Sequence, residues 1–162
     1  MPRTCFIIGP IGEPGGDVRQ AADDFMQYIV NACPALKELD YSDPIRADQL
    51  NEPGRITSQV IKLLIEADLV IADLTNNNPN VYYELSLRHA IGKPVIHMVE
   101  AGTILSFDVR DNRTIAYTMH ARVAEGASAE LARQIHRVHS AGLSALSWMV
   151  LIGLFMALRA IV

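Results

Sequence analysis

Two carboxylates in the middle of the chain, Asp73 and Glu84, have the residue types and spacing that chemistry would need. Asp73 follows a continuous apolar run at residues 69–72, which is typical of a strand buried on both faces of a parallel sheet. Glu84 falls in the second turn of a helix that we expect to begin with Asn78 as N-cap and Pro79 as its first residue. This order of strand, loop and helix carries both carboxylates toward the carboxyl edge of the sheet, where open α/β folds bind ligands.

Each carboxylate also has a purely structural interpretation. An Asp at the end of a strand often caps a helix or anchors a loop. Glu84 could instead pair with Arg88, four residues further along the same helix, and such a pair on a solvated face contributes only a few tenths of a kcal/mol. The loop between the carboxylates holds three consecutive asparagines, and Asn78 and Asn80 are candidate ligand contacts.

Composition excludes some classes of function. The 162 residues suffice for one domain with a real core. The net charge of −4 leaves no basic surface for nucleic acid, so we expect no nucleic-acid partner. Cys5 and Cys33 lie in apolar surroundings without the spacing of metal ligands. We interpret them as core residues in a reducing cytosol and expect no metal.

Strand-like and helix-like patterns alternate along the chain. They predict strands at residues 5–8, around 45, and at 69–72, 95–99 and 114–118, and helices at 17–33, 56–67 and 78 to about 91. The predicted fold is therefore an α/β, doubly wound parallel sheet of flavodoxin-like style, followed by a C-terminal helical segment.

Two further loops at predicted strand ends could contact a ligand. The first is Gly9-Pro10-Ile11-Gly12, whose glycines would let backbone amides approach a phosphate, or would simply form a turn. The second contains Arg46 and Asp48, which could contact a ribose or phosphate. They could equally pair with each other as part of the loop.

The last forty residues differ in character from the rest. We divide the chain into a domain at 1–120, a polar helical linker at 121–138 and a hydrophobic helix at 139–162. No Asp, Glu, Lys or Arg occurs from 139 to 158, and about 20 helical residues span a bilayer core of ~30 Å. We expect a single transmembrane anchor with the domain on the cytoplasmic face, since Arg133 and Arg137 precede the segment. A buried C-terminal helix or an oligomerisation helix is the alternative.

Several blocks, in the same order, resemble a known family. They are Cys5 to Gly12, Arg46-Ala47-Asp48, Gly54 to Thr57, Ala67 to Glu84, Arg88-His89-Ala90, Lys93 to Ile96, Phe107-Asp108-Val109 and Arg113 to Tyr117. Together they resemble the nucleoside 2-deoxyribosyltransferase-like branch of the TIR-like superfamily, which is common in bacterial defence loci. The resemblance covers residues 4 to about 118 and leaves out the hydrophobic tail.

This resemblance implies a flavodoxin-like fold and chemistry at an N-glycosidic bond. It makes Glu84 the nucleophilic carboxylate and Asp73 the acidic residue at the strand end. Asn78 stands where the transferases have an acid, which counts against true deoxyribosyl transfer. Asn78, Asn80 and Asp48 could bind sugar hydroxyls, and Tyr82 could stack on a base.

The leading hypothesis is an N-glycosidase that cleaves NAD or a related nucleotide, as a membrane-anchored defence effector. NAD is then a substrate, and no cofactor is expected. The alternatives are a nucleotide sensor without catalysis, a scaffold acting only through self-association, and a nucleoside deoxyribosyltransferase. The expected partners are a nucleotide or nucleoside, a membrane and further copies of the same chain as a homo-oligomer.

Overall fold

The computed structural model describes the backbone of residues 1–50 and 56–159, and the side chains of residues 1–50, 58–120 and 122–141. Its centre is a sheet of five parallel strands in the order β2-β1-β3-β4-β5. The strands are β1 (Cys5–Ile8), β2 (Ile45–Arg46), β3 (Leu69–Asp73), β4 (Val95–Glu100) and β5 (Thr114–Tyr117). This is the strand order of a doubly wound flavodoxin-like sheet, so the predicted fold class is confirmed.

β1, and β3 as far as Ala72, are continuously apolar because both faces of the sheet are covered there. In β1, Cys5 and Ile7 face one hydrophobic cluster, while Phe6 and Ile8 face the other. The same alternation holds along β3, which pairs with β1 in parallel register. A continuous apolar run, rather than an alternating one, is what such a strand requires.

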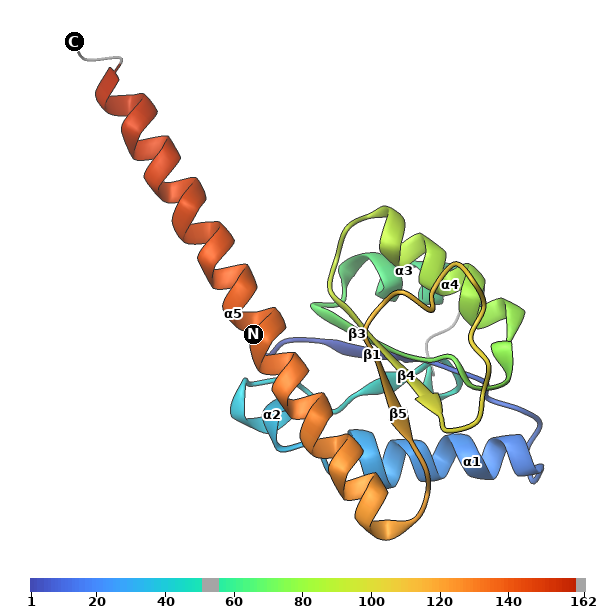
Figure 1. Ribbon diagram of the computed structural model, residues 1–162. Helices are drawn as coiled ribbons and strands as arrows, with labels where there is room; N and C mark the ends of the chain where they lie inside the picture. The colour runs from blue at the N-terminus through green and yellow to red at the C-terminus, as the bar shows by residue number, and fades with distance from the viewer. Residues whose placement is uncertain (51–55, 160–162) are drawn as a thin grey trace.

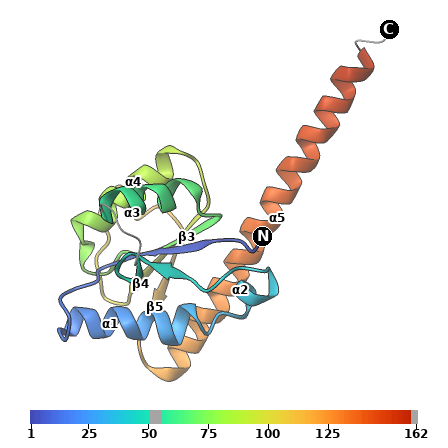
Figure 2. The same ribbon diagram turned by 180° about the vertical axis from the view of Figure 1, so that it is seen from behind.

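Helices form a layer on each face of the sheet (Figure 1). One layer holds α1 (Asp17–Phe25), a π-helical turn (Met26–Val30), α2 (Pro34–Glu38) and the start of α5 (Ala121–Arg159). The other layer holds α3 (Ile56–Glu66) and α4 (Pro79–Ala90). Figure 2 shows the same two layers from behind.

The helix expected at residues 17–33 is divided in the structure. Gly16 is the N-cap of α1, and the helix widens into the π-helical turn after Phe25. Pro34 then begins α2 as its first residue. The fixed φ and missing N–H of proline suit the first position of a helix, so one residue both ends one element and starts another.

The first half of α5 belongs to the core. Its buried apolar residues pack against the sheet together with α1 and α2, and they are Ala124, Ala127, Leu131, Ala132 and Ile135. Residues 121–138, expected as a polar linker, therefore contribute to the hydrophobic core, because one side of the helix is apolar even though the segment is polar overall. The predicted boundaries at residues 120 and 138 stay predictions.

The predicted membrane segment at residues 139–162 falls mainly outside the described side chains. The backbone of α5 continues to Arg159 and extends away from the sheet in both views (Figures 1 and 2). Among the residues that the structure describes, no helix has the length and apolar character needed to cross a membrane.

Candidate active site

A cavity of about 220 Å³ lies at the carboxyl ends of β1 and β2, against the first two turns of α4. Here it is called the Glu84 cavity. Its lining residues are Ile7, Ile8, Gly9, Ile11, Gly12, Ala47, Asn78, Asn80, Val81 and Glu84. The strand order reverses beside β1, and ligands of open α/β sheets bind at such switch points. The fold thus brings six predicted site residues from separate segments into one cavity: Gly9, Ile11, Gly12, Asn78, Asn80 and Glu84.

The asparagine-rich loop sets where α4 begins. Asn76 and Asn77 have φ values of 61° and 48°, in the left-handed region that asparagine tolerates better than most residues. Asn78 is the N-cap, and its Oδ1 accepts a hydrogen bond of 3.0 Å from the backbone N–H of Asn80. Pro79 is the first helical residue, as predicted. This cap fixes the second turn of α4, and with it Glu84, beside the ends of the strands.

Glu84 is half-buried in the cavity, and its carboxylate has no charged partner nearby among the described residues. In the described part of the chain its carboxylate has no hydrogen bond or ion pair, and it is the only ionisable side chain among the lining residues. Burial raises its pKa to about 7. A carboxyl group that titrates near neutral pH can act as a nucleophile when ionised and as an acid when protonated.

Asp73 occupies a different cavity. It lines a small space of about 50 Å³ together with Pro10, Glu100 and Tyr117. Only 5% of the residue is exposed. Its Oδ1 accepts from the hydroxyl and the backbone N–H of Thr75, at 2.5 and 3.1 Å, and its Oδ2 accepts from the Tyr117 hydroxyl at 2.9 Å. Asp73 therefore anchors the loop after β3, which is its structural interpretation.

Burial raises the pKa of Asp73, while the hydrogen bonds from Thr75 and Tyr117 act in the opposite direction. All three donors point at the carboxylate, two of them at Oδ1 and one at Oδ2. The two residues predicted as catalytic, Asp73 and Glu84, thus line different cavities, and a shared catalytic role for them stays a prediction.

The loop Gly9-Pro10-Ile11-Gly12 separates the two cavities. Pro10 lines the Asp73 side, while its neighbours line the Glu84 side. Gly12 has a φ of 67°, and a Cβ there would come within 2.8 Å of Val18 Cβ. A Cβ on Gly9 would lie 3.2 Å from Asp73 Cβ. Gly12 is required by its positive φ and by packing, and Gly9 fits closely against Asp73, so the turn interpretation accounts for both without a ligand.

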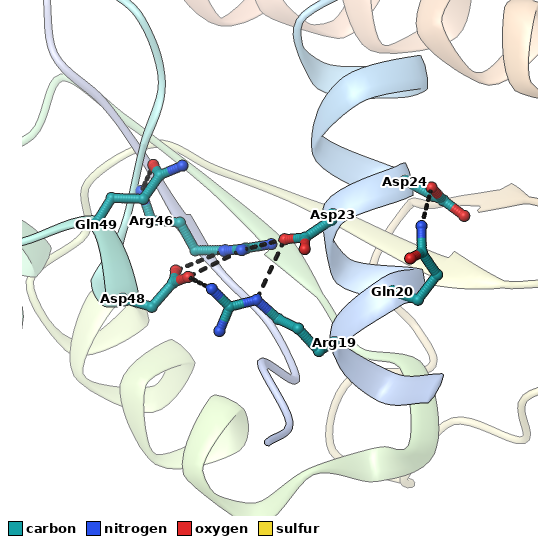
Figure 3. A network of polar contacts seen from close by, with 7 residues as sticks. All are labelled: Arg19, Gln20, Asp23, Asp24, Arg46, Asp48 and Gln49. Carbon is teal, nitrogen blue, oxygen red and sulfur yellow. Dashed lines mark hydrogen bonds and ion pairs between the residues drawn. The ribbon is translucent and has the colours of Figure 1, made fainter. Parts of the chain in front are cut away.

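Arg46 and Asp48 bind each other (Figure 3), and neither is among the residues that line the Glu84 cavity. Arg46 is 4% exposed and donates to Asp48 at 2.6 and 2.9 Å and to Asp23 of α1 at 2.5 Å. Arg19 adds a second ion pair to Asp48 at 2.5 Å. These bonds with Arg46 lower the pKa of Asp48. The loop interpretation of this pair therefore holds, and Ala47 between them is the residue that reaches the Glu84 cavity.

Tyr82 also serves the loop. Its hydroxyl donates to Asn77 Oδ1 at 2.8 Å and accepts from the backbone N–H of Ser106 at 3.4 Å. It does not line the Glu84 cavity. The lining residues that sequence reasoning missed are Ile7, Ile8, Ala47 and Val81. Their position in the chain could have indicated them, since each lies at or next to a strand end or in the first turn of a helix.

No protein-family profile matches the chain, and no curated protein matches it. Among solved structures it is similar to a 2-desoxiribosyltransferase from Leishmania mexicana, with 24% sequence identity and a TM-score of 0.45. The similarity covers 60% of this chain and 65% of that one. What the site can do follows from its own residues.

Proposed function

We propose that the protein cleaves the N-glycosidic bond of a nucleotide or nucleoside, with Glu84 as the carboxylate that acts at C1′ of the sugar. The observation that carries the proposal is a single unpaired carboxyl group with a pKa of about 7 in a cavity at the switch point of the sheet. The cavity of about 220 Å³ is smaller than the ~300 Å³ of a typical ligand pocket. We take it to hold the reacting sugar and the bond next to it, so the rest of a dinucleotide would extend outside it.

The chemistry requires negative charge where positive charge develops. Breaking the C1′–N bond sends its electron pair to the base nitrogen and leaves an oxocarbenium-like sugar. Ionised Glu84 stabilises this cation or forms an ester with C1′. Water then attacks C1′ and loses a proton, which restores the carboxylate and completes hydrolysis. Because the low-dielectric surroundings weaken solvent screening, one carboxylate has a larger effect there than at an exposed surface.

The substrate we propose is NAD or a relative with a cationic base. A neutral purine or pyrimidine leaves more readily when an acid protonates it, and general acids contribute about 10²–10⁴-fold. Among the described residues that line the cavity, Glu84 is the only ionisable one, and Asp73 lies in another cavity. Nicotinamide in NAD is already cationic and departs as a neutral molecule. A site with one carboxylate therefore suits NAD better than a neutral deoxynucleoside.

The proposal can be tested by product analysis. The protein is incubated with NAD, with deoxyadenosine, and with deoxyadenosine plus cytosine. We expect release of nicotinamide from NAD and no new nucleoside. Efficient release of adenine, or formation of deoxycytidine, would favour the transferase instead. No turnover of any substrate would favour the nucleotide sensor.

We also propose, from the sequence alone, that residues 139–162 anchor the domain to the cytoplasmic face of a membrane. The support is the run from 139 to 158 without Asp, Glu, Lys or Arg. Fractionation of cells that express the full chain, compared with a chain ending at residue 141, tests this. If both proteins stay in the soluble fraction, the segment is an oligomerisation helix or a core helix. Self-association and a role in defence stay predictions.

A further inference from the structure

Arg88, near the end of α4, is completely buried, with an exposed fraction of 0%. In the described part of the chain, its guanidinium contacts no carboxylate and donates only to backbone carbonyls. Nη1 donates to Leu64 O at 2.6 Å and Nη2 to Ala67 O at 2.9 Å. Nε and Nη2 both donate to Pro94 O, at 3.2 and 3.0 Å. A single side chain thus joins α4 to three other points of the backbone.

These carbonyls belong to elements that the fold must hold together. Leu64 lies in the last turns of α3, Ala67 follows that helix and Pro94 immediately precedes β4. The carbonyls at the end of a helix carry the negative end of its dipole, which favours a cation there. A buried charge is tolerated only when its hydrogen bonds are satisfied, and the planar fork of arginine meets several acceptors in one fixed geometry. The position of Arg88 is therefore tightly determined.

Glu84 stands one turn before Arg88 on the same helix, and the two side chains do not pair. Residues four apart lie on nearly the same side of a helix. Here Arg88 lies at the end of α4 beside α3 and the start of β4, whereas Glu84 lines the cavity at the carboxyl ends of the strands. Any shift of α4 that Arg88 resists would move Glu84 relative to the cavity.

We propose that Arg88 is a positioning residue that fixes the rotation and axial position of α4 and thereby the depth of Glu84 in its cavity. The role rests on the proposed function, in which Glu84 is the reacting carboxylate. Substrate contact is not required of Arg88, because each of its hydrogen bonds within the described residues goes to a backbone carbonyl at the end of α3 or just before β4.

The pKa of Glu84 distinguishes a positioning role of Arg88 from a direct effect of its positive charge, because the two predict shifts in opposite directions. Losing a nearby cation raises the pKa of a carboxyl group, whereas greater exposure to water lowers the pKa of a buried one. We therefore expect the pKa of Glu84 to fall from about 7 toward 4.5 when Arg88 is replaced. A fall of about one unit or more is expected for Arg88→Met, and a smaller fall for Arg88→Lys, which keeps the charge but loses the fork.

The experiment is a carbon-13 NMR titration of the Glu84 carboxyl in the wild type, Arg88→Met, Arg88→Lys and Lys93→Met. Lys93 is a matched control, since its Nζ also donates to a carbonyl near the end of α3, Ile65 O at 2.7 Å, but from an exposed position. The pKa should stay near the wild-type value in Lys93→Met. An unchanged or raised pKa in a folded Arg88 variant would overturn the proposal. The result does not depend on turnover, so it stands apart from the test of the proposed function.

Hydrogen exchange on the wild type covers the case in which both Arg88 variants fail to fold. If Arg88 holds α4 in place, the Arg88 Nε–H and the amide hydrogens of the second and third turns of α4 should exchange through the same opening. Opening of those turns while the Arg88 Nε–H stays protected would show that the helix moves independently of the arginine, and would contradict the proposal. In an active enzyme, the pH profile of kcat should shift together with the pKa of Glu84.

Discussion

Asp73 and Glu84 belong to opposite sides of the sheet. Along β3, Leu69 and Ile71 face the layer of α1 and α5, and the period of two places Asp73 on that side. Glu84 stands on α4, which covers the other face. The two carboxylates follow one another closely in sequence, yet β3 itself and the loop Gly9-Pro10-Ile11-Gly12 lie between their cavities. Because they line separate cavities, we make a different prediction for each of them.

Replacing Glu84 with Gln should abolish glycosidase activity without unfolding the protein, because the change keeps the shape and removes only the ionisable group. We expect a loss of about 100-fold or more in kcat. Glu66→Gln, an exposed change on α3, is the matched control and should retain the wild-type rate. Circular dichroism confirms the fold of both variants. Near-wild-type turnover by Glu84→Gln would remove Glu84 from the mechanism.

The rate should rise with pH through about 7. Burial raises the pKa of Glu84 to about 7, and only the ionised form stabilises the developing cation. Activity should therefore be low at pH 5 and approach a plateau above pH 8. Single-turnover rates with NAD from pH 5 to 9 measure this limb. A rate that is already maximal at pH 5 would mean that Glu84 acts in its protonated form or not at all.

The free energy of unfolding should fall as pH rises through about 7, whereas the rate rises over the same range. The folded-state pKa of Glu84 is about 7 and the reference value is 4.5, so folding retains a proton that the unfolded chain releases between these values. The contribution of Glu84 is fully present below pH 4.5 and is lost as pH rises through 7. After allowance for its partial exposure, the loss is about 1–2 kcal/mol. Urea unfolding at pH 4.5 and 8 should show Glu84→Gln gaining stability over the wild type by about that amount at the higher pH.

Asp73→Asn should damage stability rather than chemistry. The carboxylate accepts from both donors of Thr75 and from Tyr117, and an amide cannot accept all three bonds. The unfolding free energy should fall by about 1–3 kcal/mol. Turnover at a temperature where the variant is folded should stay near the wild-type rate. A folded Asp73→Asn protein without activity would restore Asp73 as a catalytic residue.

Truncation should separate the core from the tail of α5. A chain ending at residue 141 retains Leu131 and Ile135, which are fully buried, and should fold as a soluble domain. A chain ending at residue 120 loses both, and each such loss costs about 2–5 kcal/mol. The shorter chain should therefore be insoluble or unfolded. If it folds as well as the longer one, the first half of α5 is dispensable to the core.

The positions of the strands could be predicted from local sequence. Residues 5–8 and 69–72 are uninterrupted apolar runs, and only strands with helices on both faces need such runs. The start of α4 could also be predicted from local sequence, since the cap of Asn78 and the first-turn Pro79 depend only on neighbouring residues. The division of the helix after Phe25 was not predictable in this way, because a π-helical turn leaves the apolar pattern nearly unchanged.

Which residues share a cavity was decided by the tertiary structure. Sequence alone could place Asp73 and Glu84 near one edge of the sheet, but the face that α4 covers determines that they are separated. Arg46 donates to Asp23 on a distant helix, and Arg88 donates to carbonyls of α3, and neither contact could be read from the local sequence. Sequence specifies local backbone preferences, whereas long side chains with several donors bind whichever acceptors the packed elements bring within reach.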